Sequence, residues 1–522
     1  MAPPVYVALV VGYVLLMLGV GYLSMRRTRD IHDFFIGGRT FGPWVSAFAY
    51  GTTYFSAVLF IGYAGKLGWG FGIYTLWIVL GNTLVGTLLA WRLLAARTRE
   101  MTVRLGAITL PEFLRARYDS RPLQLLASVV VFVFLVPYSA SVLMGLSYLF
   151  EMTLHIRYET ALYFLTALTA VYLVMGGYFA VAVSDFIRGI VEFGGVMVMV
   201  FLLAHRPEVG GFLRATQSLL ADPRVNAPGL FATKAVGKGL LAVAIPGWLT
   251  LFALVLVTSF GPWALPQMVQ KFYAIRSRRD VTRALTIAGL FSLFMAFGAY
   301  FSGALTHLYY GPKLPRELLG PGGPIWDKIM PHFITTSGLP EALVLVIVLM
   351  VFSASMSSLS SLVLVSSSAV AIDLYGALRG GRRGGVGLLR ALCALFVGFS
   401  LVIALAKPAV IVNLMVMSWG ALSGVFLAPY LYGLFVKRTT RAGVYAGMAS
   451  GLACAFVLFP AWGPDGVPLA GALAMSVPLL VVPLVSLFTR APQPSLVAAA
   501  FGEVASPPPE PLAASTVRAS NR

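Results

Sequence analysis

The feature that most constrains this chain is a series of apolar runs, each long enough to cross a lipid bilayer. Residues 5–23, 123–149 and 344–370 consist mostly of apolar side chains. A helix of roughly 20 such residues spans the ~30 Å hydrocarbon layer of a membrane. In the whole chain 59% of residues are hydrophobic and 11% are charged, whereas soluble domains have about 25% charged residues. The sequence therefore predicts an all-α membrane protein.

Apolar runs between charged or Gly/Pro-rich loops predict thirteen transmembrane helices. They begin near Val5, Trp44, Ile73, Leu123, Ala161, Val183, Gly239, Leu285, Val344, Leu388, Val410, Val444 and Leu469. Residues 1–490 then form the transporter domain. The remaining residues, 491–522, are rich in Pro, Ala and Ser and are expected to form a disordered cytoplasmic tail.

Basic residues gather in every second predicted loop, and cytoplasmic loops carry such an excess. The clusters are Arg26, Arg27 and Arg29; Arg97, Arg99 and Arg104; Arg276, Arg278 and Arg279; Arg382 and Arg383; and Lys437, Arg438 and Arg441. This distribution accounts for the net charge of +19 without nucleic acid as a partner. It predicts a multi-pass protein of the cell (inner) membrane, with its N-terminus outside and its C-terminus in the cytoplasm.

The second predicted span contains a polar segment at mid-membrane, residues 49–56 (AYGTTYFS). Glycine and hydroxyl side chains weaken a continuous helix. A break exposes backbone carbonyls that protein, water or an ion must satisfy, so broken membrane helices usually line a binding site. The alternative is a tight crossing of helices, where small residues pack closely.

The ninth span carries a second unusual segment, residues 352–361 (FSASMSSLSS). On a helix, Ala354, Ser357, Ser358 and Ser361 share one face, with Ser360 beside it. Hydroxyl and carbonyl oxygens can replace the hydration shell of a small cation without burying an anion. A close-packed seam of small residues is the alternative.

Taken with their neighbours, these segments resemble the sodium:solute symporter family, which includes sodium/proline, pantothenate, sialic acid and glucose transporters. The resemblance extends from about residue 33 to 441. It is carried by residues 33–39 (DFFIGGR) before Trp44, by 60–62 (FIG) with Gly65, by 176–185 (GGYFAVAVSD), by 356–360 (MSSLS) through 373–375 (DLY), and by 437–443 (KRTTRAG). It implies a LeuT-type fold with two inverted five-helix repeats, at about 44–204 and 239–436.

The resemblance also implies ion sites near the membrane midplane. The family's usual sodium site corresponds to backbone carbonyls of Thr52 and Phe55, the carbonyl of Ala354, and the hydroxyls of Ser357 and Ser358. A second sodium site, found in sialic acid transporters of the family, corresponds to Asp185, Ser357, Ser360 and Ser361. The alternative role for Asp185 is a helix cap at the cytoplasmic boundary.

The predicted solute cavity lies around the break and is lined by Tyr54, Ser56, Leu59, Lys66, Trp263 and Gln267. The resemblance places Tyr54 where the proline branch has an aspartate, and Leu59 where the sugar branch has a glutamine. Lys66 could extend to the outer interface, pair with a solute carboxylate, or act as a proton-linked substitute for an ion.

The function implied is sodium-coupled import of an amino acid or small carboxylate by alternating access. The expected partners are the solute, sodium ions and the bilayer, with sodium as the coupling ion and no other cofactor. Enzymatic activity is not expected, because the five histidines are scattered and no acid/base pair shares a span. Two alternatives are a membrane sensor with a transporter-like fold and a proton-coupled or sodium-independent transporter that uses Lys66.

Overall fold

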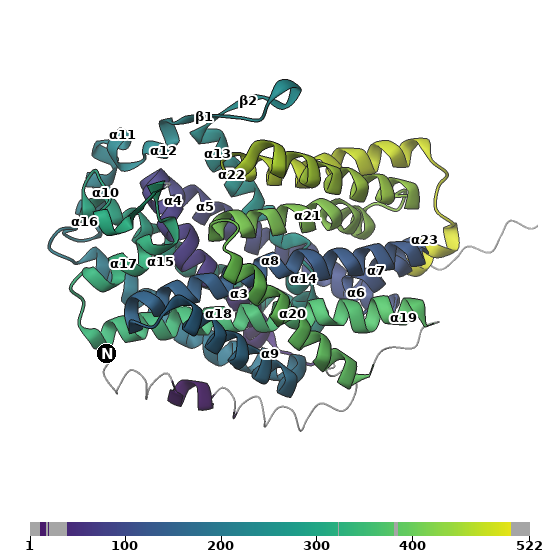
Figure 1. Cartoon of the computed structure of the whole chain (residues 1–522). Coiled ribbons are helices and arrows are strands. Elements are labelled where there is room, and N and C mark those ends of the chain that lie inside the picture. The colour runs from purple at the N-terminus through teal and green to yellow at the C-terminus, as the bar shows by residue number, and fades with distance from the viewer. Residues whose placement is uncertain (1–10, 17–18, 20–38, 322, 380–384, 503–522) are drawn as a thin grey trace, which may run out of the picture.

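The computed structural model describes residues 11–16, 19, 39–321, 323–379 and 385–502. Most of the first predicted span and three predicted features therefore lie outside the described residues. These features are the first basic cluster (Arg26, Arg27 and Arg29), the pair Arg382 and Arg383, and the end of the tail after residue 502. The described part is a bundle of helices that run roughly side by side (Figure 1).

The second predicted span is broken in its middle. Helix α3 (Pro43–Tyr54) ends where Phe55 takes an extended conformation, with φ −109° and ψ 122°. The chain resumes as the π-helix η2 (Val58–Tyr63) and continues as α4 (Ala64–Phe71). The predicted interruption between Gly51 and Ser56 is confirmed, and it lies at Phe55 and Ser56.

The rest of the first half consists of long helices. The third span is an almost continuous helical stretch, which comprises η3 (Gly72–Thr75), α5 (Leu76–Leu80), η4 (Gly81–Leu89), η5 (Trp91–Ala95) and α6 (Ala96–Arg104). The short α7 (Leu110–Tyr118) is followed by α8 (Arg121–Leu154) and α9 (Tyr158–Ala204). Helix α9 covers both the fifth and the sixth predicted spans.

A segment of short elements joins the two halves. It comprises α10 (Phe212–Ala221), α11 (Pro223–Asn226), α12 (Pro228–Phe231), and strands β1 (Thr233–Val236) and β2 (Val243–Pro246), with η6 (Gly239–Leu241) between the strands. The strands pair antiparallel, Thr233 opposite Pro246. The seventh predicted span therefore begins at Gly247 and not near Gly239, because this hairpin occupies the residues before it.

The second half also begins with a broken helix. Helix α13 (Gly247–Phe260) continues through η7 (Gly261–Trp263) and bends by 41° into α14 (Pro266–Ala274). Long helices follow: α15 (Arg278–Ala304), α18 (Glu341–Ser368), α20 (Val386–Ala406), α21 (Ile411–Phe435) and α22 (Arg441–Phe488). The shorter elements are α16 (Thr306–Tyr310), η8 (Arg316–Leu318), β3 (Leu319–Gly320), β4 (Gly323–Pro324), η9 (Trp326–Lys328), α17 (Ile329–Thr336), η10 (Ala369–Leu374), α19 (Tyr375–Leu378) and α23 (Pro494–Phe501).

The predicted count of thirteen membrane helices is not confirmed. Among the described residues, eight helices are long and apolar enough to cross a membrane, or nine if the bent α13–α14 pair is one span. Part of the difference is continuity, because α22 contains both the twelfth and thirteenth predicted spans. Gly463 breaks α22 with φ 57° and ψ −164°, so α22 is two helices joined at a kink.

Several basic residues meet at one end of the bundle, where α6, α7, α19 and α23 lie in Figure 1. Arg99 donates to the backbone oxygens of Ile275 and Arg276, and Arg117 donates to that of Gly433. The short elements α10, α11, α12, α16 and α17 lie at the opposite end (Figure 1). The described basic loops therefore share one side, as the predicted topology requires.

The beginning of the predicted tail differs from the expectation of disorder. Residues 494–501 form α23, which packs against α6 and α7. Ala500 is buried, and its backbone oxygen accepts a hydrogen bond from Arg104. Apolar residues in this part of the tail provide a surface that can pack.

Helix α18 packs against α3, α8, α9 and α20. Its serine-rich stretch from Ser353 to Ser361 is entirely buried. The helix thus places the serine face of the ninth span against the broken helix and against α9.

Candidate ion and solute site

A small cavity lies at the break between α3 and η2. Its volume is about 20 Å³, which is enough space for only one or two water molecules. No lysine, arginine, aspartate or glutamate lines it; the lining residues are Tyr54, Phe55, Ser56, Val58, Leu59, Tyr63, Asn82, Thr258, Tyr300, Met415 and Trp419. Tyr54, Ser56 and Leu59 therefore lie where the sequence predicted a solute cavity.

Neutral oxygens from α3 and α18 converge directly beside this break. The Ser358 hydroxyl lies 3.2 Å from the backbone oxygens of both Thr52 and Thr53. The Ser357 hydroxyl lies 2.8 Å from the hydroxyl oxygen of Thr52. Carbonyl and hydroxyl oxygens of this kind suit a hard cation, and the structure brings together three of the five residues predicted for the first sodium site.

The other two predicted residues flank this group. Ala354 is fully buried on α18, one helical turn before Ser357 and Ser358. Phe55 is the first non-helical residue after α3, and its ring stacks on that of Tyr54 at 4.5 Å. Because α3 ends here, backbone carbonyls of its last turn lack the continuing helix that would otherwise accept from them.

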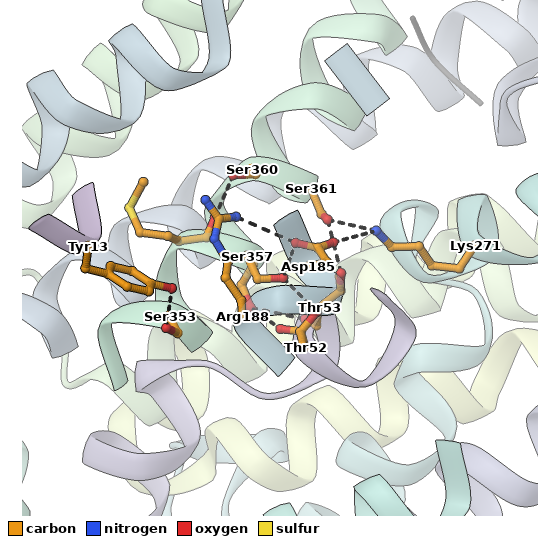
Figure 2. Close-up of polar contacts among 12 residues, drawn as sticks. Tyr13, Thr52, Thr53, Asp185, Arg188, Lys271, Ser353, Ser357, Ser360 and Ser361 are labelled. Carbon is orange, nitrogen blue, oxygen red and sulfur yellow. Dashed lines mark hydrogen bonds and ion pairs between the residues drawn. The ribbon is translucent and has the colours of Figure 1, made fainter. Parts of the chain in front are cut away.

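Asp185 lies next to this group in a buried cluster of charges (Figure 2). Its Oδ1 accepts a hydrogen bond from Ser357 at 2.7 Å and lies 3.6 Å from the Arg188 guanidinium. Its Oδ2 lies 3.5 Å from the Lys271 ammonium on α14. Asp185 is thus a buried member of an ion-pair network.

The two further serines predicted for a second sodium site differ in their contacts. The Ser361 hydroxyl accepts from Lys271 at 3.0 Å and lies 3.0 Å from the hydroxyl of Thr53. The Ser360 hydroxyl donates to the backbone oxygen of Met356 in its own helix, at 2.6 Å. The structure therefore brings Ser361 to the Asp185 cluster, while the Ser360 hydroxyl bonds within α18.

Sequence reasoning missed three charged residues of this cluster: Arg188, Glu192 and Lys271. All three are buried, with 1% exposure or less. Asp185, Arg188 and Glu192 lie at i, i+3 and i+7, the spacing of one helix face. This charged face could therefore have been predicted from the sequence. Lys271 had no such signal, because it comes just before the basic loop at Arg276.

Trp263 and Gln267 lie at the bend between α13 and α14. The indole N–H of Trp263 donates to the backbone oxygen of Val85 at 3.0 Å. The Gln267 side chain is 1% exposed, and neither its oxygen nor its nitrogen has a hydrogen-bond partner among the described residues. Neither residue lines the small cavity, so their predicted part in the solute cavity stays a prediction.

Lys66 faces a different and larger cavity of about 230 Å³, which it lines together with Lys234 and Asp465. Its ammonium donates to the side-chain oxygen of Asn413 at 3.0 Å. Burial raises the pKa of the nearby Asp327 carboxyl to about 6, although the Ile411 N–H and the Lys66 charge both lower it.

The two cavities lie one helical turn apart along three helices. Tyr63, Thr258 and Met415 line the small cavity, while the large cavity is lined by residues three or four positions away on the same helices: Lys66 and Leu67, Leu254, and Val412. The layer between the two cavities is therefore only about one helical turn thick.

Comparison with known proteins identifies the family. The sequence pattern of the sodium:solute symporter family matches residues 34–451. The chain belongs to this family. It is 30% identical over 493 residues to the high-affinity proline transporter PutP of Bacillus subtilis (strain 168), and the match covers 91% of this chain and 96% of that protein. It is 27% identical over 453 residues to a sodium/proline symporter of Salmonella typhimurium, with 84% of each protein covered.

Solved structures confirm the LeuT-type fold of this symporter. A sodium-coupled sialic acid symporter in its substrate-bound outward-open state is similar, with a TM-score of 0.73 and 19% identity, over 94% of this chain and 98% of that one. A nucleobase-cation-symport-1 family transporter in a closed conformation gives a TM-score of 0.53 at 14% identity, over 91% and 99%. Membership of a multi-pass transporter family fits the apolar helices of the bundle.

Proposed function

We propose that this symporter imports a small zwitterionic amino acid, of which proline is the first candidate, together with sodium. The observation that carries the proposal is that one helix break serves two sites. Phe55 and Ser56 line the small cavity, and the carbonyls of Thr52 and Thr53 meet Ser358 on the other side of the break. An ion bound there orders the segment that also contacts the solute, which couples the two binding events.

The lining of the small cavity supports a solute with a compact apolar part. Aromatic and aliphatic side chains make up most of its wall, and Asn82, Ser56 and Thr258 add neutral polar groups. The proline transporters among the relatives are consistent with such a solute. Tyr54 contributes an uncharged wall where the proline branch of the family is expected to have an aspartate, so this chain has one acidic group fewer at the site.

The paired cavities support alternating access. The small cavity is too small for an amino acid in this conformation, so solute binding requires movement of the layer around Tyr63 and Met415. The larger cavity lies on the side of the β1–β2 hairpin, away from the basic end of the bundle. We assign that side to the exterior and the basic end to the cytoplasm.

The membrane potential supports uptake of the solute together with sodium. Each positive charge that enters with a neutral solute gains about 2.3 kcal/mol per 100 mV of membrane potential. One sodium ion per cycle therefore concentrates the solute many-fold even before the sodium gradient is counted.

The experiment is uptake of radiolabelled proline into proteoliposomes that contain the purified chain. An inward sodium gradient is expected to drive accumulation, while choline and an inward proton gradient are not. Competition by other amino acids and by small carboxylates ranks the solutes. Equal uptake in sodium and choline would overturn sodium coupling, whereas sodium-dependent uptake of a different competitor would overturn only proline as the solute.

A further inference from the structure

The buried oxygens around Asp185 already hold a positive charge from the protein itself. Asp185 Oδ2 and the Ser361 hydroxyl lie 3.5 Å and 3.0 Å from the Lys271 ammonium. A carboxylate and a serine hydroxyl are also ligands that a small hard cation prefers. The ammonium thus takes up oxygens that a second sodium ion would need (Figure 2).

A second protein cation reaches the same carboxylate. In Figure 2 the Arg188 guanidinium and the Lys271 ammonium approach Asp185 from opposite sides, and Arg188 lies 3.6 Å from Oδ1. A sodium ion at this point would be the third cation around one carboxylate. Repulsion between like charges is strong in a buried environment, so Lys271 and a sodium ion exclude one another.

The protein already compensates the Asp185 carboxylate without an added ion, because Arg188 and Lys271 lie 3.6 Å and 3.5 Å from its two oxygens. Glu192 lies on the same face of α9 as Asp185 and Arg188 and is fully buried. A buried ion pair is costly to break because the remaining partner stays uncompensated. The pair with Asp185 therefore stabilises Lys271 in this position.

The neighbouring oxygens around Ser358 differ in this respect. The Thr52 and Thr53 carbonyls and the Ser358 hydroxyl carry no formal charge. A mobile cation is therefore favoured at this position and disfavoured at Asp185.

We propose that the Lys271 ammonium is a tethered cation that occupies the second ion position at Asp185, so that one sodium ion accompanies each solute. This inference rests on the proposed sodium symport and specifies its stoichiometry. Lys271 also links α14 to α9 and α18 through this contact, so α14 is held to the ion-binding region in the conformation described.

The first test is the number of sodium ions bound to the purified wild-type protein, measured with radioactive sodium and without any solute. One ion per chain is expected. The matching transport measurement is the membrane potential that balances a tenfold outward proline gradient with equal sodium on both sides, which is twice as large for one sodium as for two. Two ions in either measurement would overturn the inference.

Variants of Lys271 test the mechanism. Lys271→Gln frees the Asp185 site. The number of sodium ions bound per chain is therefore expected to rise to two, and the Hill coefficient for sodium to rise from about 1 toward 2. Lys271→Arg keeps the charge and is expected to bind one ion. A folded Lys271→Gln protein that still binds one ion would contradict the tethered-cation role.

The double variant Asp185→Asn/Lys271→Gln removes both charges and does not depend on the folding of Lys271→Gln. It is expected to bind one ion, at the Ser358 oxygens. Loss of all sodium binding would make Asp185 the ligand of the coupling ion and overturn the inference. Absence of sodium binding and of sodium-driven uptake in the wild type would instead overturn the proposed symport, and one bound ion without proline uptake would overturn only the proposed solute.

Discussion

Two polar clusters lie side by side along α18, and they differ in the groups that they offer to a buried cation. At Ser358 the available groups are neutral oxygens from a broken helix, whereas at Asp185 a carboxylate meets two protein cations. Ser357 contacts both clusters, because its hydroxyl lies near Thr52 Oγ1 and Asp185 Oδ1. Neutral oxygens suit an ion that must leave in every cycle, while the charged cluster suits a permanent connection between helices.

The largest effect is expected from breaking the charged cluster. In choline medium, Lys271→Gln leaves the fully buried Asp185 with less compensation, which should destabilise the protein by about 3–5 kcal/mol. Sodium should restore part of this loss by binding at Asp185. Thermal unfolding of the detergent-purified protein in the two media is the measurement.

The control is Lys234→Gln. Lys234 forms an ion pair with Asp465 at 2.5 Å, but both side chains are 54% exposed. Exposed pairs contribute about 0–1 kcal/mol, so this variant should change the stability little. Equal losses in the two variants would remove the distinction between a buried tethered cation and a surface pair.

The next effect concerns the neutral cluster. Ser358→Ala removes one oxygen that faces the Thr52 and Thr53 carbonyls, and we expect sodium affinity to fall about tenfold or more, since hydrogen-bond-type contacts to a charged group contribute about 1.5–3 kcal/mol. Solute affinity in sodium should fall with it, because coupling is reciprocal. Sodium titration of proline uptake provides the measurement.

Ser355→Ala is the matched control for Ser358→Ala. Ser355 is equally buried on α18, but its hydroxyl donates to the Val351 backbone oxygen within the helix. The sodium dependence of proline uptake by Ser355→Ala should stay close to that of the wild type. A similar loss in both variants would indicate packing of α18 and not ion binding.

A smaller effect is expected at Lys66, a half-buried cation that donates to Asn413 and lines the larger cavity. Lys66→Met keeps most of the apolar stem and removes the charge. If the ammonium meets a solute carboxylate on its way inward, KM should rise several-fold while the sodium Hill coefficient stays unchanged. Lys66→Arg is the charge-preserving control, and an unchanged KM in Lys66→Met would leave only an interfacial role.

The smallest effect concerns Asp327, beside Lys66. Its pKa is about 6 in the folded protein, above its ordinary value of 3.8, so the folded state binds the proton more readily than the unfolded state. The resulting stabilisation is complete below about pH 4 and is lost as the pH rises through about 6. In Asp327→Asn the melting temperature should change less between pH 4 and pH 7 than in the wild type. Parallel profiles of melting temperature against pH would contradict this.

The sequence was informative where composition acts locally. Gly51 and the hydroxyl side chains around it predicted the broken helix, and the spacing of the serines predicted the polar face of α18. The positions of Thr52, Ser357 and Ser358 beside one another follow from these two features and from the family resemblance.

The sequence was less informative where the tertiary fold decides the environment. Lys271 lies five residues before Arg276, and its burial depends on how α14 packs after the 41° bend from α13. The β1–β2 hairpin likewise replaces the predicted start of a span, because pairing between the strands joins residues that are distant in the sequence, such as Thr233 and Pro246. The number of membrane helices is also hard to predict from the sequence, since a single kink at Gly463 separates the two halves of α22.

On the proposed mechanism, a mobile cation binds the neutral oxygens at Ser358 while Lys271 occupies Asp185. The most direct measurement is an experimental structure determined in sodium with the solute bound. We expect an ion coordinated by backbone oxygens of the α3 break and by the Ser358 hydroxyl, with Lys271 still paired to Asp185. An ion at Asp185 with Lys271 displaced, or a continuous helix through Phe55 and Ser56, would contradict it.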